Sequence, residues 1–488
     1  MKFIHNLIIL SVLGFGVQSG LMAQEVYPGL VLFSPQPGMW DNGANIYLMN
    51  TDQQIVHSWE ADYGCSMNPY LYPDSTLLYP YKVPNPTMVS GGVGGGLLLM
   101  DWDGNTLWEF FVSNANQQQH HDIEPMPNGN LLVIAWERKT AAESYAMGRE
   151  YLGNPLNEMW VDMILELQPV GSDDAIVVWE WHLWDHLIQD VDTNLPGYGV
   201  VADHPELMDI NYGAAGGFGP GGANADWTHF NCVTYNEELD QILITSRYFN
   251  EIYIIDHSTT TEEAEGHSGG NSGMGGDFLY RWGNPQVYDM GSDQDQKLQG
   301  PHGGVWIEMG YPGEGNLLIF NNGYQWSNSA VFELIPPLNE TGLYTLEPGT
   351  DFGPESPSWI FTYSFYSMVL SGVVRLPNGN TLITVADDRR FMEVSPANQV
   401  LSDYFYSGAG STIPRTLKYD LDYLTVDNIL LGDVNDDGTL DILDVVGIVL
   451  IALNQNPMVP AADLNEDGYA NILDIIMLIN ILLEEPAE

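Results

Sequence analysis

The chain has very few basic residues. Only 13 of its 488 residues are Lys or Arg, against 65 Asp and Glu. Nucleic acids and anionic membrane surfaces are bound through clustered Lys and Arg, so this composition argues against both as partners. A solvated acidic surface, as in salt-adapted secreted proteins, is the interpretation that we favour. Any anionic substrate would need local positive charge, which histidines or an arginine inside a pocket could supply.

Cysteine and long apolar runs are also scarce. The chain has two cysteines, Cys65 and Cys232, so no disulfide framework holds the fold, and we expect two buried thiols rather than one bridge. No stretch after the first residues is long and apolar enough to span a bilayer. Residues 1–23 combine Lys2, an apolar run and small residues, which predicts a signal peptide cleaved after Ala23. We therefore expect a secreted protein that is extracellular, docked at the cell surface or periplasmic.

Helical periodicity is nearly absent before residue 430, and a short phrase recurs instead. Alternating apolar and polar residues are followed by Pro-Asn-Gly-Asn and then by an aliphatic run, at residues 121–136 and again at 371–386. Asn-Gly supplies the positive φ of a tight hairpin turn, so each copy predicts a strand, a turn and a second strand. Looser copies occur at residues 67–81, 229–246 and 302–320.

A second type of hairpin, which ends in an aromatic residue, alternates with the first type and occurs six times. The five hairpins of the first type leave one partner missing, and the N-terminal segment GLVLFSP (29–35) can supply it and close a ring. Four-stranded units repeated around an axis form a β-propeller. The predicted fold is an all-β six-bladed β-propeller over residues 24–430, followed by a small α-helical calcium-binding domain over residues 431–488.

The second domain is predicted from two copies of one phrase, DVNDDGTLDILD (433–444) and DLNEDGYANILD (463–474), each followed by an aliphatic helical run. Each copy has oxygen side chains at loop positions one, three, five, nine and twelve and Gly at position six, which suits a hard divalent cation. The spacing predicts two Ca²⁺ ions. Their ligands would be Asp433, Asn435, Asp437, Asp441 and Asp444 in the first loop and Asp463, Asn465, Asp467, Asn471 and Asp474 in the second, with Gly438 and Gly468 at the turns.

Two such loops, each with only an exit helix, resemble a type I dockerin domain over residues 432 to about 484. The resemblance implies calcium-dependent folding and docking to a cohesin module. Ile-Leu-Asp closes both loops, at residues 442–444 and 472–474. Such near-symmetry would let a partner bind in either of two orientations.

Histidine is rare, with 11 residues in the chain, yet three histidines share one position of the repeat. Aligning the first-type hairpins on their turns places these residues at the heads of the inner strands: Met67, His121, His229, His302 and Ser371. The innermost strands of a propeller surround its axis, so equivalent positions converge there and predict a site. In the segment ADWTHFNCV (225–233), strand alternation would put Trp227, His229 and Asn231 on one face of the same channel.

The predicted histidine cluster permits two chemistries. Neutral imidazoles could ligate a transition metal. Alternatively, one imidazole could be a nucleophile or general acid while the others, with Arg247, hold an anion. Asp122 follows His121 and should point to the opposite face.

The phrases DWTHFN (226–231) and ILITSR (242–247), followed by RWGNP, PHGGVW, LLIFNNG and LPNGNTLI, resemble the bacterial arylsulfotransferases. The resemblance implies a six-bladed periplasmic propeller. It also implies transfer of a sulfuryl group between phenols through a sulfated histidine, without a nucleotide sulfate donor. On this resemblance, His229, Asn231 and His302 match active-site positions of the family.

The chain departs from the family pattern at two places. The family nucleophile is a histidine in a later blade than His302, but no histidine follows His302 in this chain. Ser371 stands at the aligned position, and His121 is the other strand-head histidine that could take the role. The family arginine expected just after FNNG is also missing.

The leading hypothesis is a secreted arylsulfotransferase-like enzyme, tethered through its dockerin, that moves a sulfuryl group from an aromatic or carbohydrate sulfate ester to an acceptor hydroxyl. His229 and His302 would bind the sulfuryl oxygens, and Asn231 would donate a hydrogen bond. Two alternatives stay open. One is a polysaccharide lyase or hydrolase with a metal held by His121, His229 and His302. The other is a non-catalytic binding propeller in a cohesin-docked assembly.

Overall fold

A computed structural model describes residues 25–37, 43–219, 221–323, 327–339, 342–424, 432–435, 439–453, 459–462, 464–465 and 469–484. The predicted signal peptide (1–23) lies outside the described residues. The same holds for three predicted calcium ligands and both loop glycines: Asp437, Asp463, Asp467, Gly438 and Gly468.

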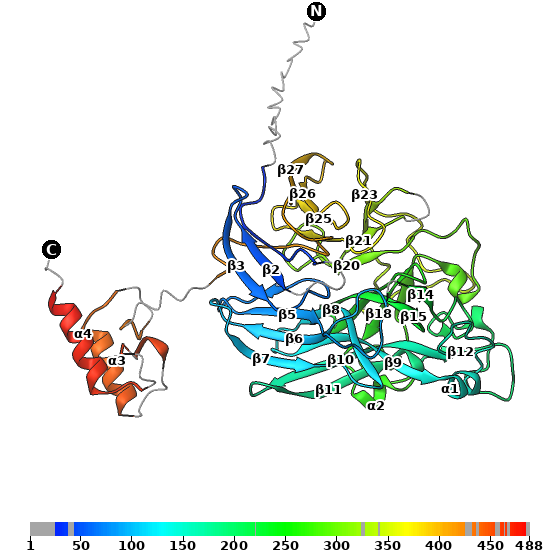
Figure 1. The fold of residues 1–488 in the computed structure, drawn as a ribbon, viewed down its shortest axis with the longest axis horizontal. Helices are drawn as coiled ribbons and strands as arrows, with labels where there is room; N and C mark the ends of the chain where they lie inside the picture. The colour runs from blue at the N-terminus through cyan, green and yellow to red at the C-terminus, as the bar shows by residue number, and fades with distance from the viewer. Residues whose placement is uncertain are drawn as a thin grey trace, which may run out of the picture.

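In the described part of the chain, six four-stranded antiparallel sheets form the blades of a β-propeller (Figure 1). We name each blade after its innermost strand. The strands of the first three blades, from inner to outer, are β4 (Tyr70–Leu71), β5 (Leu77–Lys82), β6 (Gly95–Met100) and β7 (Thr106–Phe111); β8 (Gln117–Pro125), β9 (Leu131–Thr140), β10 (Glu158–Val170) and β11 (Asp174–His182); and β16 (Phe230–Asn236), β17 (Gln241–Ser246), β18 (Glu251–Asp256) and β19 (Tyr280–Trp282).

The remaining three blades follow the same order. Their strands are β20 (His302–Trp306), β21 (Leu317–Asn321), β22 (Ala330–Leu334) and β23 (Trp359–Phe361); β24 (Gly372–Arg375), β25 (Thr381–Val385), β26 (Arg390–Val394) and β27 (Val400–Phe405); and β28 (Leu417–Tyr419), β1 (Leu30–Phe33), β2 (Ala44–Met49) and β3 (Ile55–Ala61). The predicted six-bladed propeller is confirmed.

The Pro-Asn-Gly-Asn phrases form the expected hairpin turns. Gly129 and Gly379 have φ values of 84° and 87°, which a residue with a side chain rarely adopts. Each turn is closed by backbone hydrogen bonds, such as Met126 N to Asn130 O at 2.9 Å and Leu376 N to Asn380 O at 2.8 Å. The turns fix the register of the strands and thereby the position of each strand head.

The ring is closed by strands from both ends of the propeller. β28 is the innermost strand of its blade, and β1 pairs with it in antiparallel register, with Val31 opposite Lys418. The segment 29–35 therefore closes the ring as predicted, but as the second strand rather than the first. A returning strand of only three residues, β28, takes the inner place. Figure 1 shows the N-terminal strands (blue) beside the β24 blade (gold).

The core is divided among the gaps between neighbouring blades. Each of the six gaps contains one cluster of buried apolar side chains. In the closing gap, Val31 and Phe33 pack with Leu382 and Phe391. Burial of one such side chain stabilises the fold by about 1.5–3 kcal/mol. Apolar packing between the blades therefore holds the ring together. Both cysteines, Cys65 and Cys232, are buried free thiols, as predicted.

Short elements are inserted between strands around the β8 and β16 blades. They are α1 (Ala141–Ala146), η1 (Leu183–Asp185), β12 (Leu187–Ile188), η2 (Val201–Asp203), β13 (Met208–Asp209), β14 (Gly217–Gly219), β15 (Gly222–Asn224), α2 (Thr261–Ala264) and η3 (Pro285–Tyr288). A capping box starts α1 at Thr140 and α2 at Thr260. Leu187, Val201 and Met208 join the largest core cluster, so these insertions are part of the packed body.

The C-terminal part contains the two predicted helices, α3 (Ile442–Ala452) and α4 (Ile472–Glu484), and a short turn, η4 (Pro460–Ala462). α3 and α4 lie side by side (Figure 1) and share a small core that includes Val445, Ile448 and Leu478. Among the described residues, no helix has the length and apolar character needed to cross a membrane.

Candidate active site

The heads of the inner strands have an unusual backbone. His121 and His229 have φ values of 50° and 55°, and Ser371 has a φ of 82°. In the three strands that carry the imidazoles, the pairing with the next strand also shifts register at the head, between Gln119 and Ile123 in β8, Phe230 and Cys232 in β16, and His302 and Val305 in β20. Such bulges redirect a side chain, and they aim the imidazoles toward the axis.

The left-handed conformation of His229 corrects one sequence expectation. Trp227, His229 and Asn231 do not share a strand face, because β16 begins only at Phe230 and is bulged there. Trp227 is buried in the core, where its indole N–H donates to Tyr212 O at 2.9 Å. Asn231 donates to Pro301 O at 2.8 Å, and so supports the strand head that carries the next imidazole.

The imidazoles of His121 and His229 lie together, with ring centroids 4.6 Å apart in an edge-to-face arrangement. A glycine-rich loop between β5 and β6 covers them. A Cβ atom on Gly92 would lie 2.1 Å from His121 Nε2, and one on Gly91 would lie 3.2 Å from His229 Cε1. Two consecutive glycines therefore let the backbone rest directly on both rings.

His121 is hydrogen-bonded to its neighbour in sequence. The Nδ1 atoms of His120 and His121 are 2.9 Å apart. His120 Nε2 forms an ion-pair contact of 2.8 Å with Asp162, although the geometry is not that of an aligned hydrogen bond. A carboxylate oxygen facing Nε2 favours the proton there, so in the neutral pair His120 Nδ1 accepts and His121 Nδ1 donates. This assignment leaves a lone pair on His121 Nε2.

His229 has a carboxylate partner of its own. Its Nδ1 is 2.5 Å from Asp226 Oδ2, and this oxygen also accepts a hydrogen bond from Ser90 at 2.8 Å. The other carboxylate oxygen, Oδ1, accepts a hydrogen bond from the Trp136 indole at 3.1 Å. The pair is almost completely buried. A buried carboxylate beside an imidazole orients the ring and compensates a positive charge on it.

His302 is held by neutral groups. Its Nδ1 lies 2.8 Å from Asn322 Oδ1 and 3.0 Å from Gly300 O. The Asn322 amide donates to Ser367 O and Leu370 O, so its oxygen faces the imidazole as an acceptor. His302 therefore carries its proton on Nδ1 and presents the lone pair of Nε2.

The three imidazoles differ in their electrostatic surroundings. Burial, together with the nearby His229, His120, His302 and Arg247, lowers the pKa of His121 well below its usual value. Burial and the charge of Arg247 lower the pKa of His302 to about 3. Burial raises the pKa of Asp226, but the charge and hydrogen bond of His229 outweigh burial and lower it overall. The site thus contains neutral imidazoles beside an imidazole with an ionised partner.

Arg247 brings positive charge to the cluster. Its backbone N–H donates to His229 O at 3.1 Å, and its guanidinium lies 5.7 Å from the ring centre of Tyr248. Tyr248 in turn stacks on His229, with ring centroids 4.4 Å apart. Arg247 therefore stands where it could attract an anion to the imidazoles in a strongly acidic protein.

The other two strand heads predicted from the repeat, Ser371 and Met67, have no acidic or basic side chain. The Ser371 hydroxyl is buried and accepts a hydrogen bond from Ala386 N at 3.0 Å. Met67 is fully buried.

Sequence reasoning missed the basic residue on the axis, Arg415. It precedes β28 and makes two hydrogen bonds to Asp122, at 2.9 and 3.1 Å. It also donates to Tyr70 at 2.6 Å and to Cys232 at 3.1 Å. Arg415 therefore joins the β28 blade to the β4, β8 and β16 blades.

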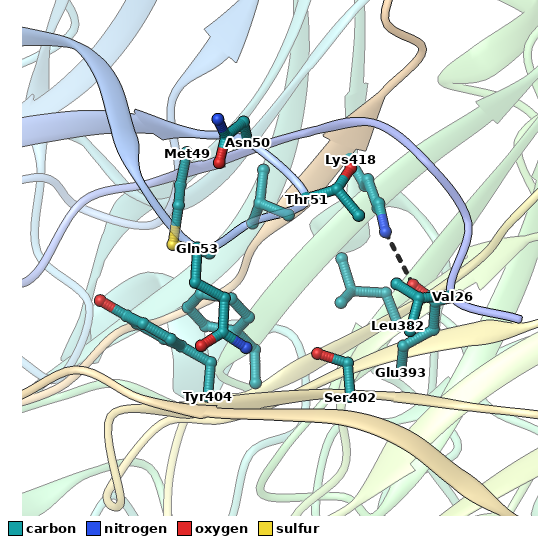
Figure 2. A pocket seen from close by; sticks show the side chains of 12 residues that line it. Val26, Met49, Asn50, Thr51, Gln53, Leu382, Glu393, Ser402, Tyr404 and Lys418 are labelled. Atoms are coloured by element: carbon teal, nitrogen blue, oxygen red, sulfur yellow. Dashed lines mark hydrogen bonds and ion pairs between the residues drawn. The ribbon is translucent and has the colours of Figure 1, made fainter.

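The metal-dependent alternative needs ligand atoms at short mutual distances. Among the described residues, the group whose ligand atoms all lie within 4.8 Å of one another is His186, His267 and Asp277, away from the strand heads. His121, His229 and His302 do not form such a group. Figure 2 shows a hollow between the β24 and β28 blades, spanned by the Lys418–Glu393 ion pair at 2.7 Å, and no candidate site residue lines it.

The described calcium loop residues suit a cation. Asp444 and Asp474, the last ligand of each loop, are fully buried and accept hydrogen bonds from backbone N–H groups, such as Val434 N at 3.0 Å and Leu464 N at 2.9 Å. Residues 431–488 contain no Lys or Arg that could neutralise them. Carboxylate and amide oxygens are ligands of Ca²⁺, so the donor set fits this ion.

The fold and the site together define the class of this protein. It is a β-propeller with a polar site of imidazoles, buried carboxylates and an arginine at the heads of its inner strands. Residues 81–344 match the family model "Arylsulfotransferase (ASST)", which spans His121, His229, Arg247 and His302. Residues 431–483 match "Dockerin type I domain". The chain belongs to the arylsulfotransferase family and carries a type I dockerin domain.

Solved structures with similar folds are much more distant. A protein of unknown function from Bacteroides caccae is 12% identical, with a TM-score of 0.43 over 80% of this chain and 98% of that one. The periplasmic gluconolactonase PpgL of Pseudomonas aeruginosa is 11% identical, with a TM-score of 0.39 over 79% and 97%. Similarities this low do not bear on function. A search of curated proteins gives no match.

Proposed function

We propose that this protein is a secreted sulfotransferase that moves a sulfuryl group from a phenolic sulfate ester to an acceptor hydroxyl, with His121 as the group that carries it. The observation that supports this role most strongly is the 2.9 Å contact between the Nδ1 atoms of His120 and His121, with Asp162 2.8 Å from His120 Nε2. With the proton of His120 on Nε2, His121 carries its own proton on Nδ1 and has a free lone pair on Nε2. A neutral, oriented imidazole is a competent nucleophile.

In the first step, His121 Nε2 attacks the sulfur of the ester. The N–S bond forms as the bond from sulfur to the phenolic oxygen breaks, and the leaving oxygen takes a proton from His229. Asp226, 2.5 Å from His229 Nδ1, stabilises the protonated form of that imidazole before transfer. Arg247 balances the negative charge of the sulfuryl oxygens.

In the second step, the acceptor hydroxyl gives its proton to His229 Nε2 and its oxygen attacks the sulfur. The N–S bond breaks, and both imidazoles return to their starting states. One histidine with an ionised carboxylate partner and one kept neutral by burial thus take the acid and nucleophile roles. His302, also neutral, would contact the substrate, and Asn231 would position the strand that carries it.

The test is transfer from a chromogenic phenyl sulfate to a phenol acceptor. His121→Ala should lower the rate of transfer by about a thousandfold or more. His229→Ala should lower it about 10²–10⁴-fold, with a smaller loss for donors whose phenolate leaves easily. His204, which is half-exposed and bonded only to Glu206 at 2.8 Å, gives the matched control, since His204→Ala should leave transfer unchanged. Transfer that survives His121→Ala would overturn the assignment.

A second function, docking, is favoured by the C-terminal domain. Two apolar pairs at equivalent loop positions, Ile442 with Leu443 and Ile472 with Leu473, are exposed at the starts of α3 and α4. Paired exposed apolar side chains on a small acidic domain are typical of an interaction surface. They support binding of a cohesin module in either of two orientations, with two Ca²⁺ ions that hold the loops. Proteins with this domain occur outside the cell or at its surface, in agreement with the predicted signal peptide.

A further inference from the structure

A buried histidine outside the axial site, His186, has an acceptor at each of its two ring nitrogens. It follows η1, and its side chain is fully buried. Its Nδ1 is 2.7 Å from an oxygen of Asp277, and its Nε2 is 2.9 Å from Ala264 O. Both neighbours are acceptors, but a neutral imidazole has only one N–H. The second contact is therefore satisfied either by a second proton, which makes the ring an imidazolium, or by a cation bound at that nitrogen.

A second imidazole points at the same carboxylate. His267 Nδ1 lies 2.8 Å from the Asp277 oxygen that faces His186. The ligand atoms of the three residues all lie within 4.8 Å of one another. The His267 side chain is 60% exposed, so the group opens to solvent on one side. Two imidazole nitrogens and a carboxylate oxygen around one point form a ligand set that suits a divalent transition metal.

We propose that His186, His267 and Asp277 bind a divalent transition metal ion of the Zn²⁺ type, with a fourth position open to water. With the metal bound, Nε2–H of His186 donates to Ala264 O and the lone pair of Nδ1 faces the ion. A backbone carbonyl that fixes the outer nitrogen of a ligand histidine is the usual arrangement around such metals.

The surroundings of His186 fit a built site. The indole of Trp181 stacks on the imidazole, with an angle of 5° between the planes, and donates to Gly276 O at 2.7 Å. A Cβ atom on Gly276 would lie 2.6 Å from His186 Nε2, so the glycine lets the chain pass close to the ring. Ligands of a tetrahedral Zn²⁺ lie about 2.1 Å from the ion and therefore roughly 3.4 Å from one another. The contacts from His186 Nδ1 and His267 Nδ1 to Asp277, at 2.7 and 2.8 Å, must both open when the ion binds.

The metal would join two distant parts of the chain. His267 and Asp277 lie in a glycine-rich segment after α2, whereas His186 belongs to the insertion after β11. Four glycines of this segment have positive φ: Gly269, Gly270, Gly273 and Gly275. Glycine loses more conformational freedom on ordering than any other residue, so ordering this loop has a large entropic cost. A metal ion bound by His267 and Asp277 would offset that cost.

The test uses the full chain with excess Ca²⁺ throughout, so that the dockerin loops are filled. Titration with Zn²⁺, followed by calorimetry, should show one ion bound per chain. His267→Ala, at an exposed position where the fold tolerates truncation, should weaken Zn²⁺ binding by about 100-fold or more. His204→Ala should leave it unchanged, because His204 meets one carboxylate and no third ligand. Co²⁺ should give a visible ligand-field spectrum in the parent chain that His267→Ala removes.

Three results would overturn the proposal: no Zn²⁺ uptake by the parent chain, equal uptake by His267→Ala, or loss of uptake in His302→Ala but not in His267→Ala. The last result would place the ion at the axis instead.

Discussion

His120 and His121 are adjacent in sequence, and their Nδ1 atoms lie 2.9 Å apart. The backbone of His121 is left-handed, with a φ of 50°. The contact makes His120 a positioning residue that fixes the tautomer of its neighbour. His120→Phe would keep the stacking on Trp136, now at 3.9 Å between centroids, but would remove the acceptor. We expect kcat for sulfuryl transfer to fall about 100-fold, with a small change in KM. An unchanged kcat would show that the pair has no role in transfer.

The glycine cover over the imidazoles gives a second prediction. Gly92→Ala should abolish transfer, because the new Cβ would lie 2.1 Å from His121 Nε2 and must displace the ring or the loop. Gly104→Ala is the matched control. Gly104 has a similar φ, 84° against 72°, but nothing lies within 4 Å of an added Cβ, so only backbone strain results. Equal activity of the two variants would mean that the loop does not constrain His121.

The electrostatics predict the acid side of the pH profile. Because the pKa of His121 is well below 6.5, the imidazole stays neutral as the pH falls below 6.5, and kcat/KM should not decline there as for an ordinary histidine base. Arg247 contributes to this lowering, so Arg247→Gln should move the acid limb to higher pH, whatever its effect on the maximal rate. A decline centred near pH 6.5 in the parent enzyme, or a limb that Arg247→Gln leaves in place, would contradict this assignment.

The ion pair beneath the site should matter for stability. Arg415→Ala leaves Asp122 buried without its partner, and removal of one member of a buried pair costs about 3–5 kcal/mol. Arg138→Ala breaks the more exposed pair with Glu158 and should cost at most about 1 kcal/mol. Thermal unfolding of the two variants measures the difference. Similar melting temperatures would show that Arg415 does not hold the blades together.

Calcium should control the C-terminal domain alone. Without a cation, the buried carboxylates of Asp444 and Asp474 carry negative charge that no basic residue of the domain compensates. The free energy of Ca²⁺ binding therefore contributes directly to the free energy of folding. In a chelator, limited proteolysis should release a fragment that starts near residue 430 and leave a stable piece of roughly 400 residues. Asp444→Asn with Asp474→Asn should mimic the chelator in excess calcium, whereas Asp52→Asn, an exposed propeller acid, should not. A tail that resists protease in the chelator would contradict calcium-dependent folding.

The sequence predicted the blades because their turns are local. Asn-Gly at residues 128–129 and 378–379 fixes two of the hairpins, and alignment of these with the looser copies at residues 229–246 and 302–320 picks out His121, His229 and His302. Strand alternation failed at Trp227, because one residue with positive φ and one bulge reverse the faces of a strand.

The partners of the imidazoles could not be predicted in the same way. Asp162 belongs to β10, a third strand, and Asp226 belongs to the segment before β16, so their contacts depend on tertiary packing rather than on any repeat. Arg415 was missed because β28, which it precedes, has only three residues, too few for an alternation pattern.

The central claim is that His121 carries the sulfuryl group. Its most direct test is incubation of the enzyme with a phenyl sulfate donor and no acceptor, followed by mass spectrometry of the intact chain and its peptides under conditions that preserve N–S bonds. We predict one added sulfuryl group per chain, located on the peptide that contains His121 and discharged when a phenol is added. A sulfuryl group on His229, His302 or Ser371, with His121 unmodified, would contradict the account.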